Sequence, residues 1–246
     1  MGRGTLSFYS PMKLWYYEGS SKMKGTIRLL AGMLIVSLGS AMAGTITGVG
    51  TRTGLGANDM VLWGDSSMDG AYVGSPFAVV SAGGINVSAA LAGGLGIWEQ
   101  DGGWGYYGAF SPGDILLDSS GNSGPLTIDF NTAVRGVGFN IQTLYVGQFT
   151  GTMQFFGAGN ILFGTVNVSG TTQATNDGSA PFLGGTSSLR DITRVVISTS
   201  GTGPELTINQ MSLLTTDPVT AIPEPSTITL VSAAIVGGVL MRRRRT

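Results

Sequence analysis

Short segments in which apolar and polar residues alternate constrain the fold of this chain more than any other feature of its sequence. Residues 126–130 carry an apolar side chain at every second position, and residues 137–141 repeat the pattern. A period of two places the apolar side chains on one face of a β-strand. Residues 131–133 between the two segments can form only a short connection. We therefore predict that the two strands are neighbours.

No stretch between residues 44 and 216 has a useful length of helical periodicity. Glycine accounts for 41 of 246 residues and falls, with Ser, Asn, Asp and Pro, between the alternating segments, while 42% of residues are apolar and can fill a core. Many short strands separated by turn residues are typical of sandwiches and jelly rolls. We therefore predict an all-β body, a β-sandwich or jelly roll over residues 44–216. Further strands are expected at residues 152–156, 161–168, 193–198 and 206–214, with the first strand and its turn in residues 44–56.

The chain contains neither cysteine nor histidine. It therefore has no disulfide, no thiolate nucleophile and no histidine to serve as general base or metal ligand. Charge is also unevenly distributed: residues 44–241 hold four basic and thirteen acidic side chains, a net charge of −9, and no lysine. A body of this charge does not bind phosphate backbones by releasing counterions, so we expect no nucleic-acid partner.

The N-terminal segment has the three parts of a secretory signal peptide. Lys24 and Arg28 precede the apolar run 29–38, and a small-x-small pair, Ala41 and Ala43, follows it. This order predicts a signal peptide over residues 23–43, with a short helix and cleavage between Ala43 and Gly44. A buried core helix is the alternative. Residues 1–22 are interpreted as a start-site extension upstream of a true initiator at Met23, with a genuine N-terminal extension as the other interpretation.

The C-terminal segment also has three parts in a fixed order, after a short linker at residues 217–222. Two prolines keep the first part extended and out of any helix. An apolar stretch over residues 227–241 follows, which we predict to be a short transmembrane helix, and a basic cluster then acts as a stop-transfer signal on the cytoplasmic side. The predicted processing motif is Pro223, Glu224 and Pro225, and the predicted stop-transfer residues are Arg242, Arg243, Arg244 and Arg245.

The combination of Pro223-Glu224-Pro225, a short span and a closing arginine cluster resembles the PEP-CTERM sorting signal over residues 223–246. The resemblance implies recognition by an exosortase and a Gram-negative host that makes exopolysaccharide. It also implies a precursor held in the inner membrane and a final place at the cell surface or in the extracellular matrix. An ordinary single-span anchor is the alternative. Residues 105–214 are loosely similar to the bodies of uncharacterised PEP-CTERM proteins, a resemblance that implies no known activity.

Aromatic residues are concentrated in residues 98–110. Exposed tryptophan and tyrosine rings are flat amphipathic surfaces that can stack on sugar rings. Trp98, Trp104, Tyr106 and Tyr107 are therefore the candidate sugar-binding residues. The competing interpretation, which we favour at this stage, is a hairpin whose aromatic rings fill the core.

Oxygen-bearing side chains are also grouped near residues 58–69 and include Asn58, Asp59, Asp65 and Asp69. Loops of this composition can hold calcium, but the spacing differs from that of an EF-hand loop, and we interpret these residues as turn formers. No pair of carboxylates has a recognisable catalytic spacing. We expect no metal, no cofactor and no catalytic residues.

Together these features predict an exported, non-enzymatic surface or extracellular-matrix protein. Its expected partners are the export machinery, an exosortase, the membrane through the C-terminal helix, and exopolysaccharide. The alternative function is that of a carbohydrate-binding module centred on residues 98–110.

Overall fold

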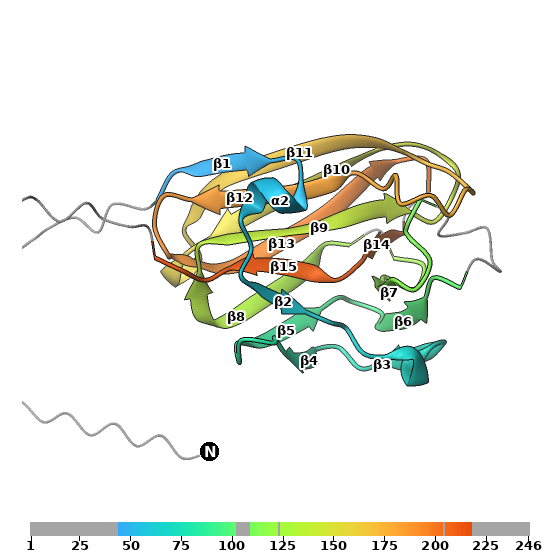
Figure 1. Cartoon of the computed structure of the whole chain (residues 1–246), viewed down its shortest axis with the longest axis horizontal. Coiled ribbons are helices and arrows are strands. Elements are labelled where there is room, and N and C mark those ends of the chain that lie inside the picture. Colours follow the sequence, from blue (N-terminus) through green and yellow to red (C-terminus); the bar gives the residue numbers. More distant parts are fainter. Residues whose placement is uncertain (1–43, 102–108, 123, 204, 218–246) are drawn as a thin grey trace, which may run out of the picture. The chain divides into compact units, whose positions relative to one another are not determined.

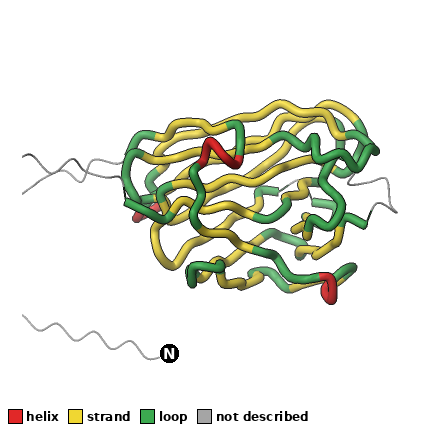
Figure 2. The backbone as a smooth tube through the Cα atoms, in the orientation of Figure 1, coloured by secondary structure: helices red, strands yellow, loops and turns green. Residues whose placement is uncertain are grey.

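The computed structural model describes residues 44–101, 109–122, 124–203 and 205–217, and the following statements concern those residues. They form two antiparallel sheets that face each other across a hydrophobic core (Figures 1 and 2). The predicted all-β body is thereby confirmed. The predicted signal-peptide helix and transmembrane helix lie outside the described residues, and within those residues no helix combines the length and the hydropathy needed to span a membrane.

The first sheet has nine strands. Its main path runs β1–β12–β9–β14–β7–β6–β3, and β15 pairs with both β9 and β2. The bounds are β1 Ile46–Val49, β2 Asp59–Val61, β3 Ala71–Val73, β6 Leu95–Glu99, β7 Ile115–Asp118, β9 Gly136–Thr143, β12 Phe182–Ser187, β14 Leu206–Ile208 and β15 Met211–Leu214.

The second sheet has six strands in the order β11–β10–β13–β8–β5–β4. Its strands are β4 Phe77–Val80, β5 Asn86–Ala90, β8 Leu126–Val134, β10 Gly147–Phe156, β11 Leu162–Thr172 and β13 Ile192–Gly201. Three short helical turns complete the described elements: α2 Arg52–Leu55, η1 Ser66–Met68 and η2 Ala158–Asn160.

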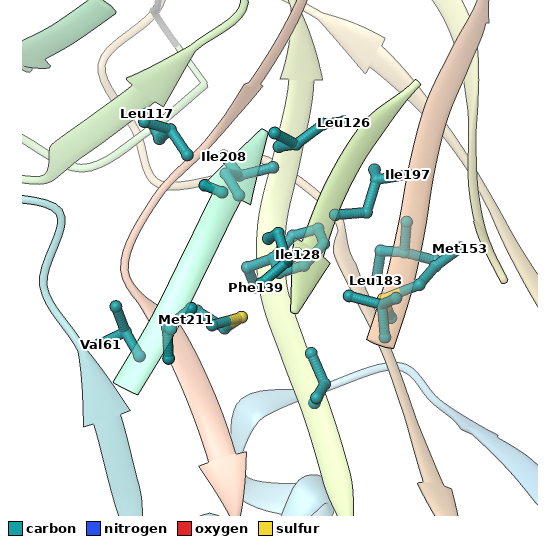
Figure 3. Packing of buried hydrophobic residues seen from close by; sticks show 14 of the residues in the cluster. Val61, Leu117, Leu126, Ile128, Phe139, Met153, Leu183, Ile197, Ile208 and Met211 are labelled. Atoms are coloured by element: carbon teal, nitrogen blue, oxygen red, sulfur yellow. The ribbon is translucent and has the colours of Figure 1, made fainter. Parts of the chain in front are cut away.

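Side-chain alternation explains how the two sheets make one core. Along β10 the buried residues Phe149, Met153 and Phe155 alternate with half-exposed polar ones, as a period of two requires. Figure 3 shows apolar side chains from both sheets meeting, among them Ile128 of β8 and Phe139 of β9. The burial of these rings and branched chains is the main stabilising contribution to such a fold.

The prediction that the strands within residues 126–141 are neighbours is wrong. Both strands form, as β8 and β9, but they are not neighbours in a sheet. β8 pairs with β5 and β13, whereas β9 pairs with β12, β14 and β15. The chain crosses from one sheet to the other at Arg135, whose backbone N–H donates to the Leu214 carbonyl. Alternation gives each strand a buried face, but it does not say on which side of the core that strand lies.

Two further differences concern strand boundaries. The strand expected over residues 206–214 is two short strands, β14 and β15, separated at Asn209 and Gln210. The strands from β2 to β6 were not predicted, because each of them is only three to five residues long. Segments this short contain too few residues for a clear alternating pattern.

A close approach of backbones inside the first sheet depends on glycine. A Cβ atom added to Gly138 of β9 would lie 2.4 Å from the Phe182 ring, and one added to Gly184 of β12 would lie 2.5 Å from the same ring. The two glycines are directly paired in the register of β9 and β12. The ring of Phe182 therefore packs against this glycine pair, where a larger residue would displace it.

Candidate functional site

Most of the predicted site residues lie outside the described residues. This applies to Trp104, Tyr106 and Tyr107, and to the terminal motifs, which comprise Ala41, Ala43, Pro223, Glu224, Pro225, Arg242, Arg243, Arg244 and Arg245. Two of the predicted site residues are described: Trp98 in β6, and Gly44, with which the described chain begins. The processing and sorting motifs therefore remain predictions.

Trp98 is part of a small aromatic pair at the edge of the first sheet. Its ring meets that of Tyr72 edge to face, with centroids 6.2 Å apart and an interplanar angle of 87°. Tyr72 lies on β3, the edge strand, and is 75% exposed. This geometry is a favourable one for aromatic pairs, and it leaves one face of a tyrosine ring open to a ligand.

Trp98 also packs against buried apolar residues. The residue is half-buried against a satellite cluster made by Ala109, Phe110, Leu116 and Ala180, which supports the core-filling interpretation of this segment for Trp98 and for the buried Phe110. The sequence analysis did not identify Tyr72. Its exposed position on a three-residue edge strand leaves no periodic signal, and its partner Trp98 is 26 positions away in the sequence.

The interpretation of the acidic segment as turn formers holds for Asp65, which caps a short helical turn, but not for Asp59, which lies in β2 and bonds to residues 22 and 24 positions away. Asp59 accepts hydrogen bonds from Ser81 Oγ at 2.6 Å and from the Gly83 N–H at 2.6 Å. Asp65 caps η1 by accepting from the Ser67 N–H at 3.0 Å, and the hydrogen bonds from Ser67 hold the pKa of this carboxyl below its ordinary value. The described residues contain no group of three side chains placed to hold a metal ion.

The outer face of the second sheet carries uncharged polar side chains across three strands, interrupted by Val196 of β13, which is paired with Gln154. In β10, Thr150 is paired with Ser169 of β11 on one side and with Ser200 of β13 on the other. One step along the strands, Thr152 is paired with Asn167 and Ser198 in the same way. We call this the hydroxyl face and define it by Gln148, Thr150, Thr152, Gln154, Thr165, Asn167, Ser169, Thr171, Ser198 and Ser200.

A shallow hollow of about 520 Å³ lies at one end of the hydroxyl face. Its lining includes Gln148, Thr150, Ser169, Thr171 and Ser200. Charge is found toward the opposite end of the same strands, where Arg194 Nε donates to Asp129 Oδ1 at 2.6 Å. The pKa of Arg194 is accordingly raised, first by this hydrogen bond. The hollow therefore presents groups that can both donate and accept hydrogen bonds and that carry no net charge.

No protein-family model matches the sequence, and no curated protein matches it either. Two solved structures show partial similarity. One is a DUF4465 family protein from Bacteroides caccae, with 9% identity and a TM-score of 0.43 over 65% of this chain and 100% of that one. The other is CsCBM6-3 from Clostridium stercorarium, solved in complex with cellobiose, with 16% identity and a TM-score of 0.28 over 50% of this chain and 82% of that one. At these values neither structure assigns a ligand or an activity to this chain.

Proposed function

We propose that this chain is an exported, non-catalytic surface or matrix protein of a Gram-negative bacterium, and that its β-sandwich body associates with neutral exopolysaccharide. In this proposal the N-terminal signal directs export through the general machinery. The C-terminal tail holds the precursor in the inner membrane until an exosortase processes it. The sequence motifs at the two ends support the export and sorting part of the proposal.

The hydroxyl face is the observation that carries the association with polysaccharide. A neutral polysaccharide offers rows of hydroxyl groups that each donate and accept hydrogen bonds, and Ser, Thr, Asn and Gln side chains do the same. On a sheet these side chains recur at the fixed spacings of the strands and of successive same-face residues, so they form a regular grid. The absence of charge on the hydroxyl face near the hollow favours a neutral chain over an ionic one.

Substitution on the hydroxyl face tests this part of the proposal. The variant combines Thr150→Val, Ser169→Ala and Ser200→Ala, which removes three hydroxyl groups while keeping β-branched or small side chains on exposed strands. Three lost hydrogen bonds at about 0.5 kcal/mol each or more weaken binding by at least about tenfold. The measurement is retention in affinity electrophoresis through host exopolysaccharide.

A matched control is Thr47→Val, which changes an exposed threonine on β1 of the other sheet. We expect its retention to equal that of the unmodified protein. If the triple variant keeps full retention while its circular dichroism is unchanged, the hydroxyl face is not the binding surface.

A second candidate function is that of a carbohydrate-binding module using aromatic stacking, and the exposed ring of Tyr72 against Trp98 favours it. Tyr72→Ala removes an exposed side chain and leaves the core untouched, so the fold is expected to persist. Under this candidate, Tyr72→Ala or Trp104→Ala abolishes retention on the polysaccharide. Under the hydroxyl-face proposal, both variants are retained as before.

The sorting part of the proposal has an independent test. The intact mass of the protein from its native host, with and without the exosortase, is compared. Loss of everything beyond the Pro223–Pro225 region in the enzyme-containing strain alone supports sorting by the exosortase. A species that keeps the four terminal arginines in both strains indicates an ordinary membrane anchor and contradicts the proposed sorting.

A further inference from the structure

Gly44 lies in a close-fitting cradle at the start of the described chain. It is buried, and its backbone nitrogen donates to Asp191 Oδ2 at 2.6 Å. A Cβ atom at this position would lie 1.9 Å from Ser187 Oγ, 2.8 Å from Asp191 Oδ2 and 3.1 Å from Asp191 Oδ1. Both carboxylate oxygens therefore face Gly44, and a side chain at this position would require Ser187 and Asp191 to move.

Asp191 has unused capacity for a cation. Its Oδ1 atom is buried and has no hydrogen-bond partner among the described residues. Among the described residues no arginine forms an ion pair with Asp191; Arg190 Nε donates to the Ala133 carbonyl at 2.8 Å, and Arg135 Nε to the Ser187 carbonyl at 3.3 Å. A buried carboxylate oxygen without a partner is costly, so this position favours a donor that carries positive charge.

We infer that Asp191 is the binding site for the α-ammonium group created when the signal peptide is removed before Gly44. Hydrolysis adds the hydroxyl of water to the Ala43 carbonyl carbon and a proton to the Gly44 nitrogen. The new amine then takes a second proton from solvent. The single amide N–H that one carboxylate oxygen accepts in the precursor becomes an ammonium with three N–H groups and a unit positive charge, which can satisfy both oxygens.

Capture of the new terminus stabilises an exposed edge of the sandwich. β1 is the edge strand of the first sheet and pairs only with β12 in that sheet. Thr45 continues the attachment, since its N–H donates to Ser188 Oγ at 3.0 Å and its carbonyl accepts from the Ser188 N–H at 3.1 Å. Chain termini fray unless they are tied down, and an edge strand can recruit other chains. Capture of the terminus after maturation therefore fixes the start of this edge strand.

The mature sequence offers a direct chemical readout. All three lysines, Lys13, Lys22 and Lys24, precede Gly44, so in a chain that starts at Gly44 the α-amine is the only primary amine. An amine-reactive ester then labels one group, and its rate reports how much of that group is free and unprotonated. A carboxylate partner favours the protonated form, and a pKa rise of one unit lowers the rate about tenfold.

The inference rests on the proposed export, and the experiment separates the two. A fusion cut directly before Gly44 supplies the mature chain whether or not native processing occurs, and a second fusion supplies the same chain starting at Ala43, both kept in mild detergent. Acylation at pH 7 by N-hydroxysuccinimide acetate is followed by mass spectrometry. We expect the Gly44 terminus to react at least about tenfold more slowly than the Ala43 terminus, and Asp191→Asn to remove that difference.

Equal rates for the two termini overturn the capture by Asp191, whatever happens to Asp191→Asn. N-terminal sequencing of the exported protein is the second measurement. A mature chain that begins at a residue other than Gly44 overturns the assignment of this cradle to maturation, whereas a chain that stays in the cytoplasm contradicts the proposed function.

Discussion

Replacing Trp63 by phenylalanine tests how the turn between β14 and β15 is held. Trp63 is fully buried in the main core, and its indole N–H donates to the Asn209 carbonyl at 2.8 Å. Trp63→Phe leaves that buried carbonyl without its donor, at about 1–3 kcal/mol, and removes three ring atoms from a packed site, at about 1–2 kcal/mol more. The expected loss in the free energy of unfolding is therefore about 2–5 kcal/mol.

The same substitution at Trp98 is the matched control. The Trp98 indole nitrogen is buried but has no hydrogen-bond partner among the described residues. Trp98→Phe removes an unsatisfied donor, which offsets part of the lost packing, so we expect a loss below about 1.5 kcal/mol. Thermal and urea unfolding followed by circular dichroism measure both variants, and a loss of 2–5 kcal/mol lowers the Tm by roughly 5–15 °C. Equal losses for the two variants would refute the role assigned to the Trp63–Asn209 hydrogen bond.

Three further predictions concern stability. Burial raises the pKa of Glu205, and the charge of Asp118 raises it further. The free energy of unfolding therefore falls as pH rises from the unfolded pKa of about 4.3 through the raised folded pKa. Glu205→Gln should flatten this fall and increase the Tm at pH 7. Gly201 has φ +116°, and a Cβ there would lie 2.5 Å from the Gln148 carbonyl oxygen, so Gly201→Ala should cost at least about 2 kcal/mol in urea unfolding. Arg194→Met should cost less than about 1 kcal/mol, because its ion pair is partly exposed, and a larger loss that salt does not reduce would contradict this.

The strands with long alternating segments were predictable, and the physical reason is local. In β10 the polar residues Gln148, Thr150, Thr152 and Gln154 occupy every second position, so the pattern itself assigns an inner and an outer face, whereas β13 has three consecutive apolar residues at 195–197. The order of strands was not predictable in this way. β10 lies between β11 and β13, yet its pairing with β13 joins residues about 40–50 positions apart. Nothing in the sequence of either strand indicates with which strand it pairs.

The candidate sites also differ in how much of them local sequence could predict. Alternation in β10 and β11 already places threonine, asparagine and serine opposite the buried phenylalanine and methionine of β10 and the half-buried valines of β11, so the polar face of each strand could have been identified from the sequence. What could not be identified was that β13 extends this face on the other side. Tyr72 was missed for a related reason, since its importance comes from contact with Trp98 on the neighbouring strand.

The sequence by itself determined the all-β character of the body, its acidic and histidine-free chemistry, and the export and sorting motifs that we predict at its ends, because these depend on residue type, period and order along the chain. The tertiary structure decided which strands share a sheet, where the hydroxyl face forms, and that Gly44 and Asp191, 147 positions apart, come into contact. Those features depend on pairings between distant segments. Such pairings arise only when each strand buries its apolar face against the others, and local sequence does not specify them.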